Sequence, residues 1–227
     1  VFIQTIMTFA TLMDFGISSG ITKFTAEYEA DKNHLKILQV FNTLFIVYLF
    51  ICIWFFIAIF VCQDWIIITF IRTEQIVKAD ISFILLSSAA IFGMNIAFNV
   101  YPSFLDGLQR MDLTNKARIL WGICNFLFSA VFLSVGWGIK GLVIANGLSS
   151  LITLFVYILF SAKVAPYLRL NPLLFDFATL VRVFRFSSYG ALGGILAMLH
   201  FQFDKLIISY FLGLKYLAFY DMAQRIV

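Results

Sequence analysis

The stretch ILQVFNTLFIVYLFICIWFFIAIFVCQ, residues Ile37–Gln63, contains no charged side chain. An α-helix needs about 20 mostly apolar residues to cross the hydrocarbon core of a bilayer. Lipid offers the backbone no hydrogen-bond partners, so that only helices and closed barrels span it. The stretch is too long and too uniformly apolar for a barrel strand. It therefore predicts a membrane-spanning helix.

The rest of the chain repeats this pattern between short connections. Four further stretches lack charge and come close to spanning length, and two partial stretches flank the five. The four are Ile81–Leu105, Ile119–Ile139, Gly141–Ala162 and Phe186–Phe203; the partial ones are Val1–Thr22, whose one charge is Asp14, and a segment from about Tyr216 to Val227. We therefore predict an all-α, polytopic transmembrane helix bundle. Because the chain begins and ends inside apolar segments, we expect it to be a piece of a longer protein.

Composition supports this class and excludes others. Hydrophobic residues make up 62% of the chain and charged residues 12%, with a mean hydropathy of +0.97. Soluble domains average about 45–50% apolar and about 25% charged residues. The net charge of +4 is small and spread out, which gives nucleic-acid binding no support. No HExxH, phosphate-loop or GxSxG motif is present, so no enzyme, cofactor or metal site is predicted.

Basic residues in the connections predict the orientation of the bundle. Ten Lys and Arg residues fall on one side of the predicted membrane and five on the other, and cytoplasmic loops carry the excess. The ten are Lys23, Lys32, Lys36, Arg110, Lys116, Arg118, Lys163, Arg169, Arg182 and Arg185. Their side should be cytoplasmic. The connection Gln63–Asp80 is apolar but charged, and we expect it to lie as an amphipathic turn at the interface.

A polar stripe marks the first segment. At about 100° per residue, five polar side chains share one face of a helix: Gln4, Thr8, Thr11, Asp14 and Ser18. Polar stripes in membrane helices face the bundle interior or a water-filled cavity. Gly16 and Gly20 add a GxxxG spacing, which lets another helix approach closely. Asp14 is therefore a candidate for a substrate cavity or for a packed helix contact.

Three further features are candidates for the interior. Asn95 and Asn99 lie one turn apart and precede Pro102, which can kink the helix. Gly190 and Gly194 repeat the GxxxG spacing and predict a second tight helix contact. Arg225 follows Asp221 by four residues and lies deep in its predicted span, where a cation should face a cavity or a partner.

Three stretches resemble the O-antigen and polysaccharide flippases of the multidrug/oligosaccharidyl-lipid/polysaccharide exporter superfamily. They are MDFGISSGITKFTAEYEA (Met13–Ala30), FLDGLQRMDLTNKARI (Phe104–Ile119) and FDKLIISYFLGLKYLAFYDMAQRIV (Phe203–Val227). The resemblance implies a two-lobed exporter fold, with helices two to six in residues 1–163. A cytoplasmic linker at 164–182 and the start of the second lobe at 183–227 would follow.

The resemblance also implies the activity and its site. Such proteins flip a polyprenyl-pyrophosphate-linked oligosaccharide across the cytoplasmic membrane by alternating access between two lobes. The partners would be that substrate, membrane lipids and, for coupled transport, a proton or sodium ion. The polar stripe of the first segment, Asn95, Asn99 and Arg225 would line the cavity.

Other functions fit parts of the pattern. A drug or organic-cation antiporter of the same superfamily is compatible with Asp14, although Arg225 argues against it. A membrane-embedded transferase that uses lipid-linked sugars would need acidic or histidine motifs at the membrane boundary, and none is seen. In a structural subunit without transport, the polar stripe would serve packing alone.

Overall fold

The computed structural model describes Asp14, residues 16–67 and 75–188, and residues 204, 205, 207, 208, 211, 220 and 223, with side chains from residue 80 onward in the second range. This part of the chain contains helices and turns and no strand, which confirms the all-α class. The helices are α2 (Ile17–Ala30), α3 (His34–Ile66), α4 (Gln75–Ala97), α5 (Val100–Gly107), α6 (Met111–Ser134) and α7 (Gly138–Val164).

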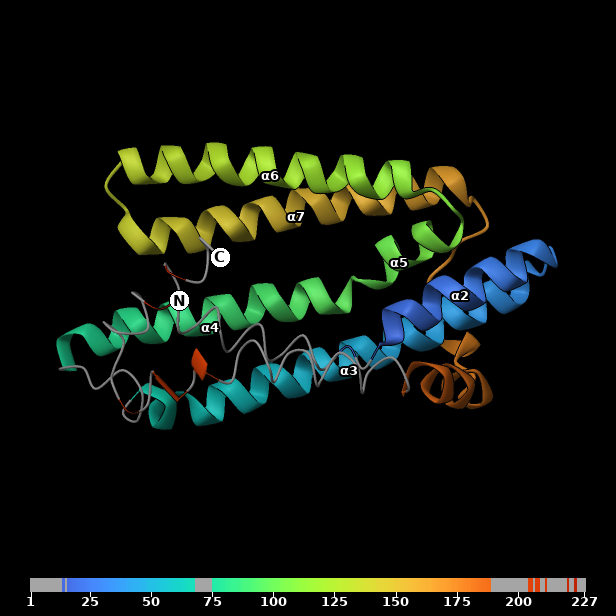
Figure 1. Cartoon of the computed structure of the whole chain (residues 1–227), viewed down its shortest axis with the longest axis horizontal. Helices are drawn as coiled ribbons and strands as arrows, with labels where there is room; N and C mark the ends of the chain where they lie inside the picture. The colour runs from blue at the N-terminus through green and yellow to red at the C-terminus, as the bar shows by residue number, and fades with distance from the viewer. Residues whose placement is uncertain are drawn as a thin grey trace.

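Two pairs of long helices and two shorter helices, α2 and α5, make up the described bundle (Figure 1). Helices α6 and α7 run antiparallel along each other, and α3 and α4 form a second pair. A contact between α4 and α7 joins the pairs, while α2 packs against α3 and α5 at one end. The order of the elements therefore puts the α2–α3 and α5–α6 turns at the same end of the molecule.

Among the described residues, four helical segments are long and apolar enough to cross a membrane: His34–Ile66, Asp80–Gly107, Met111–Ser134 and Gly138–Val164. They correspond to four of the predicted spans, and the protein is an integral, multi-pass membrane protein. The predicted turn at Gln63–Asp80 is wrong at both ends, because α3 continues to Ile66 and α4 begins at Gln75. Its centre lies outside the described residues.

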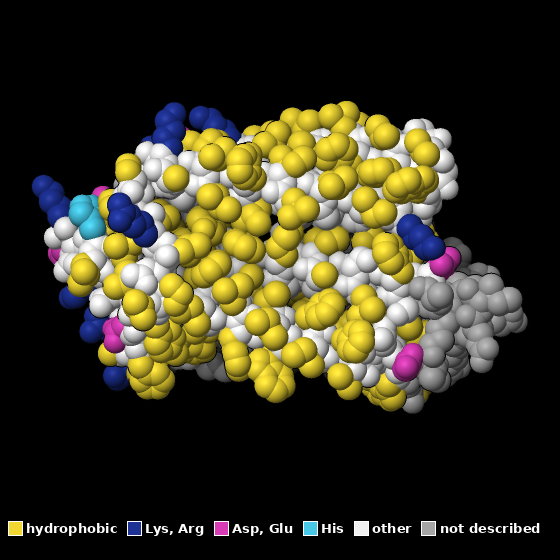
Figure 2. Space-filling view, turned by 180° about the vertical axis from the view of Figure 1, so that it is seen from behind, with side chains coloured by type: hydrophobic (Ala, Val, Ile, Leu, Met, Phe, Trp, Pro, Cys, Tyr) yellow, Lys and Arg dark blue, Asp and Glu magenta, His cyan; other side chains and the backbone are white. Residues whose placement is uncertain are grey.

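The outer surface of the long helices is apolar, as a lipid-facing surface must be. Phe126 exposes 73% of its surface, Val61 72% and Phe155 61%. Figure 2 shows hydrophobic side chains covering both helix pairs along most of their length. Exposure of so many large apolar groups would be costly in water, at about 25 cal/mol per Å².

Charge gathers at the two ends of the bundle. Figure 2 shows most Lys and Arg side chains at one end, which is the end of the α2–α3 and α5–α6 turns. At the opposite end Lys140 forms an ion pair with Asp80, with Nζ and Oδ1 2.7 Å apart. This separation agrees with the predicted asymmetry of the basic residues.

The core lies where α2, α3 and α5 meet. Ile17, Ile21 and Phe104 are fully buried, and the Phe41 ring meets the rings of Tyr101 and Phe104 edge-on at 5.1 and 5.4 Å. Gly107 permits the close approach of α5 to α2: a Cβ there would lie 2.6 Å from Cβ of Thr25. A larger residue at position 107 would force these two helices apart.

The predicted kink near Pro102 is a break between α4 and α5. Proline has no N–H to donate to the carbonyl of Phe98, four residues earlier. That carbonyl accepts instead from the Tyr101 N–H, at 3.1 Å, and the Asn99 N–H bonds to the Ile96 carbonyl three residues back. The backbone therefore stays hydrogen-bonded through a tighter turn, which places Asn99 at the junction.

The segment after α7 folds back over α3. The buried Asn42 side chain donates to the Arg169 carbonyl at 3.0 Å and accepts from the Asn171 N–H at 2.7 Å. The 3₁₀-helix η3 (Pro172–Leu174) follows, and then the helical residues 177–188. The predicted linker is thus fixed to α3, whereas the division into two lobes stays a prediction.

Burial and a neighbouring carboxylate act together on Tyr167 in this segment. Its ring lies 4.1 Å from the His34 ring, and its hydroxyl donates to Oε2 of Glu29 at 3.3 Å. Partial burial first, and then the negative charge of Glu29, raise the pKa of Tyr167 to about 12. The contact connects the end of α2 to the residues that follow α7.

Candidate functional site

Asp14 lies two residues before Gly16, the N-cap of helix α2. The polar stripe was predicted on one helix from Val1 to Thr22, but α2 begins at Ile17. Gly16, its N-cap, has a φ of 69°, in the left-handed region that glycine adopts without steric cost. Asp14 therefore lies before the start of α2, whereas Ser18, its hydrogen-bond partner, lies in the first turn of that helix.

The Asp14 carboxyl group is bonded to a neighbouring helix. The Ser18 hydroxyl donates to Oδ2 at 2.8 Å, and the Tyr48 hydroxyl of α3 donates to Oδ1. Tyr48 is fully buried, and the Asn99 side chain also lies at its hydroxyl. Both carboxyl oxygens thus have partners within the protein, and a chain of polar groups runs from Asp14 through Tyr48 to Asn99.

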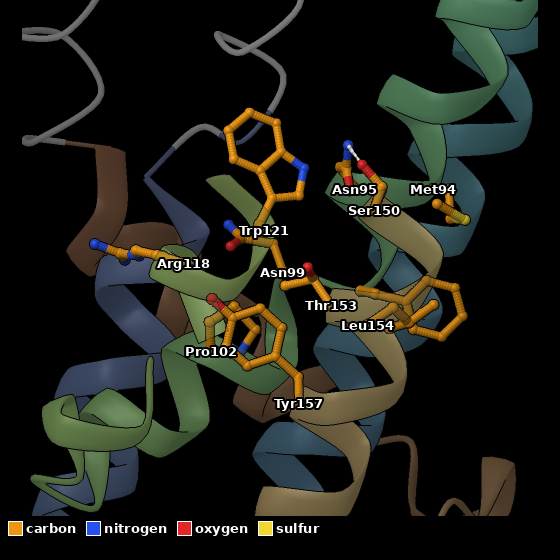
Figure 3. Close-up of a pocket in the computed structure, with 11 residues that line it drawn as sticks. Met94, Asn95, Asn99, Pro102, Arg118, Trp121, Ser150, Thr153, Leu154 and Tyr157 are labelled. Carbon is orange, nitrogen blue, oxygen red and sulfur yellow. Dashed lines mark hydrogen bonds between the residues drawn. The ribbon is translucent and has the colours of Figure 1, made fainter. Parts of the chain in front are cut away.

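A cavity of about 200 Å³ lies on the other side of Asn99, between α4–α5 and α6–α7 (Figure 3). It brings together Asn95 and Asn99, which were both predicted to line a cavity, whereas Asp14 is not among its lining residues. The lining residues are Met94, Asn95, Phe98, Asn99, Pro102, Arg118, Trp121, Ser150, Thr153, Leu154 and Tyr157.

Most polar groups of the cavity are amides and hydroxyls. Nδ2 of Asn95 donates to Oγ of Ser150 at 3.3 Å, which is a long hydrogen bond. Arg118 is the one cation among the described lining residues, and its side chain interacts with the Tyr157 hydroxyl. In the part of the chain that the structure describes, no carboxylate lines this cavity. Such a surface can exchange hydrogen bonds with a neutral polar ligand.

Sequence analysis missed several lining residues, although α7 carries a signal for them. Ser150, Thr153 and Tyr157 recur at spacings of three and four residues, which places them on one helix face. The stretch was treated only as a charge-free span. Arg118 was counted as a loop cation, yet it lies two turns inside α6.

Gly20 lies at a second close contact. A Cβ at this position would lie 2.6 Å from Cγ1 of Val183 and 2.8 Å from Oγ of Ser187. Lys23 lies over the Phe186 ring, 4.2 Å from its centroid, and Arg182 donates to the Tyr28 hydroxyl at 2.7 Å. The helical residues 177–188 therefore pack along α2, with Gly20 at the closest point.

Several predicted site residues lie outside the described part of the chain: Gln4, Thr8, Thr11, Gly190, Gly194 and Arg225. Their predicted roles stay predictions. Among the described residues, no group of three or more His, Cys, Asp or Glu side chains is arranged to hold a metal ion.

Comparison with known proteins connects this bundle to polysaccharide synthesis. The chain is 18% identical, over 223 residues, to a Shigella flexneri protein named "Putative O-antigen transporter". The match covers 96% of this chain and 51% of that protein, so the chain spans about half the length of this curated relative. No solved structure matches the chain.

The family match extends over the whole sequence. Residues 1–227 match the family described as "Polysaccharide biosynthesis protein". This match agrees with the resemblance of the three quoted stretches and with the prediction of a transporter in place of an enzyme. The chain belongs to the polysaccharide biosynthesis protein family.

Proposed function

We propose that the protein transports a polyprenyl-pyrophosphate-linked oligosaccharide from the cytoplasmic to the outer leaflet of the cell membrane. The observation that carries this proposal is the cavity of amides and hydroxyls among membrane-spanning helices. A glycan cannot cross hydrocarbon unaided, since each polar group without a hydrogen bond costs several kcal/mol. A polar cavity within the bundle can replace the lost water, and the family supports a polysaccharide-related cargo.

In this proposal the described helices form most of a first lobe, and the helical residues 177–188 begin a second. Alternating access would then require the lobes to separate at one face and meet at the other. The contacts of Gly20 with Val183 and Ser187 would belong to the basic, cytoplasmic side. Asp14 would hold α2 to α3 through Tyr48, and Arg225 would contribute a cation from the second lobe.

The direct test is flipping of a lipid-linked oligosaccharide by the full-length protein in proteoliposomes. The unaltered protein should move the substrate, and Asp14→Ala and Arg225→Ala should each reduce the rate. Lys116→Ala is a suitable control, because Lys116 is an exposed residue at the start of α6 whose only ion pair is 3.9 Å long. Export of organic cations without flipping would contradict the proposal.

Coupling to an ion is a separate part of the proposal. Asp14 is the one acidic residue in the predicted first span, and a proton or sodium gradient would be the energy source. The assay would impose a pH gradient and a sodium gradient in separate vesicle preparations. Faster flipping under one gradient would identify the coupling ion. The same flipping rate with the pH gradient, with the sodium gradient and without any gradient would show that flipping is uncoupled.

A further inference from the structure

We propose that the cavity between α4–α5 and α6–α7 binds a single sugar ring of the cargo, with Trp121 as the surface on which the ring stacks. This inference rests on the proposed function and locates recognition of the glycan within the first group of helices. Its geometry comes from three elements: the helix break at Asn99, the Trp121 face of α6 and the polar face of α7.

The chemistry of the lining matches sugar hydroxyls. A sugar hydroxyl both donates and accepts hydrogen bonds, and so do the amides of Asn95 and Asn99 and the hydroxyls of Ser150 and Tyr157. The long Asn95–Ser150 bond can be exchanged for bonds to a ligand at little cost. In Figure 3 this pair meets from α4 and α7 across one side of the cavity.

The same lining disfavours other ligands. An organic cation would need a carboxylate, and none is found among the described residues that line the cavity. A pyrophosphate group would need several donors and more positive charge than one guanidinium, which here already interacts with Tyr157. A fully apolar ligand would offer the two amides no hydrogen bonds beyond those that they make within the protein. A polyhydroxylated ring satisfies the amides and hydroxyls together.

Trp121 supplies the apolar surface that sugar binding also needs. The C–H faces of a pyranose ring are apolar and stack on an aromatic ring, and Trp offers the largest one. Trp121 is 39% exposed and lines the cavity, while Tyr157 offers a second ring beside Asn99. The cavity, at about 200 Å³, has room for one ring and not for a whole repeat unit.

The test measures flipping kinetics of the full-length protein with a lipid-linked oligosaccharide. Trp121→Leu and Asn95→Leu should each raise the apparent KM by about tenfold, the size of effect that loss of one well-packed contact gives. The maximal rate should change little. Trp121→Phe should recover most of the loss, since it keeps an aromatic face. Trp54→Leu is the matched control, because Trp54 lies on the exposed surface of α3.

Bare polyprenyl pyrophosphate, which lacks the sugar, separates the glycan from its carrier. It should inhibit the unaltered protein and the Trp121→Leu variant with the same inhibition constant. If the inhibition constant of the bare carrier also rose tenfold in the Trp121→Leu variant, the sugar assignment would be overturned in favour of a lipid-phosphate site. An unchanged KM in both variants would overturn it as well. Absence of flipping by the unaltered protein would instead count against the proposed function.

Discussion

The contact around Asp14 and the cavity beside Asn95 meet at Asn99, but they use polar groups in opposite ways. Asp14 has its carboxyl oxygens bonded to Ser18 and Tyr48, and Tyr48 is fully buried. Asn95 is exposed, and its hydrogen bond to Ser150 is long, at 3.3 Å. A polar residue inside a membrane bundle can therefore be structural or available to a ligand, and hydrogen-bond satisfaction separates the two.

The largest effect on the packed side should come from Tyr48→Phe. The change leaves Oδ1 of Asp14 without its donor inside the bundle, which costs about 1–3 kcal/mol for a buried polar group. The free energy of unfolding, measured by denaturant titration in detergent, should fall by this amount. Thr153→Val, whose hydroxyl bonds only to the Ser149 carbonyl of its own helix, provides a control with a smaller loss. An unchanged stability in Tyr48→Phe would show that the Asp14 contact is dispensable.

A pair of glycine substitutions sharpens the contrast between close packing and open surface. Gly107→Ala would place a Cβ 2.8 Å from the Thr22 carbonyl oxygen, and overpacking of this kind costs about 1–3 kcal/mol. At Gly122, in α6, the same change meets no atom within 4 Å. There it should be neutral or stabilise by up to about 1 kcal/mol through helix propensity. Thermal midpoints of the two variants should shift in opposite directions, and equal shifts would contradict the packing described for α2 and α5.

The smallest effect concerns a polar group outside both regions. Asp176 caps the helical residues 177–188: it accepts from the Thr179 N–H at 2.9 Å, and the bonds from Thr179 lower the pKa of its carboxyl group. Because the folded pKa is lowered, the stabilisation is present above the usual aspartate range and is lost as the pH falls through the folded pKa. Asp176→Asn should keep the cap and lose this pH dependence. Hydrogen exchange of residues 177–180 at pH 3 and pH 7 measures it.

The sequence predicted the membrane class and most helices because hydropathy and length decide which segments span a bilayer. Helix ends were harder: α3 continues past Gln63 because Asp64 and Trp65 extend the helix beyond the apolar run. The break at Gly16 was read as a packing spacing, since glycine serves both purposes and local sequence does not distinguish them. The break between α4 and α5 was predicted correctly from Pro102, because the hydrogen bond that proline cannot donate lies within the same helical turn.

The site was predicted only in part, for a reason that is three-dimensional. Asn95 and Asn99 were predicted from one helix, but their cavity also depends on residues of α6 and α7, which only the packing of the helices brings beside them. Asn42 shows the same limit. It is a polar residue near the start of the apolar stretch Ile37–Gln63, and its partners Arg169 and Asn171 lie far away in the sequence.

The junction at Asn99 also has a mechanical consequence. Helix α5 packs mainly against α2, whereas α4 packs mainly against α3, so the two halves of this membrane crossing have different main neighbours, although both also contact α3 and α7. At this joint the Phe98 carbonyl accepts from the Tyr101 N–H in a tight turn, in place of the regular helical bond that Pro102 cannot donate. A ligand that fills the neighbouring cavity would press directly on the joint. Binding of a ligand in the cavity and any change of the angle between α4 and α5 would then both act at Asn99.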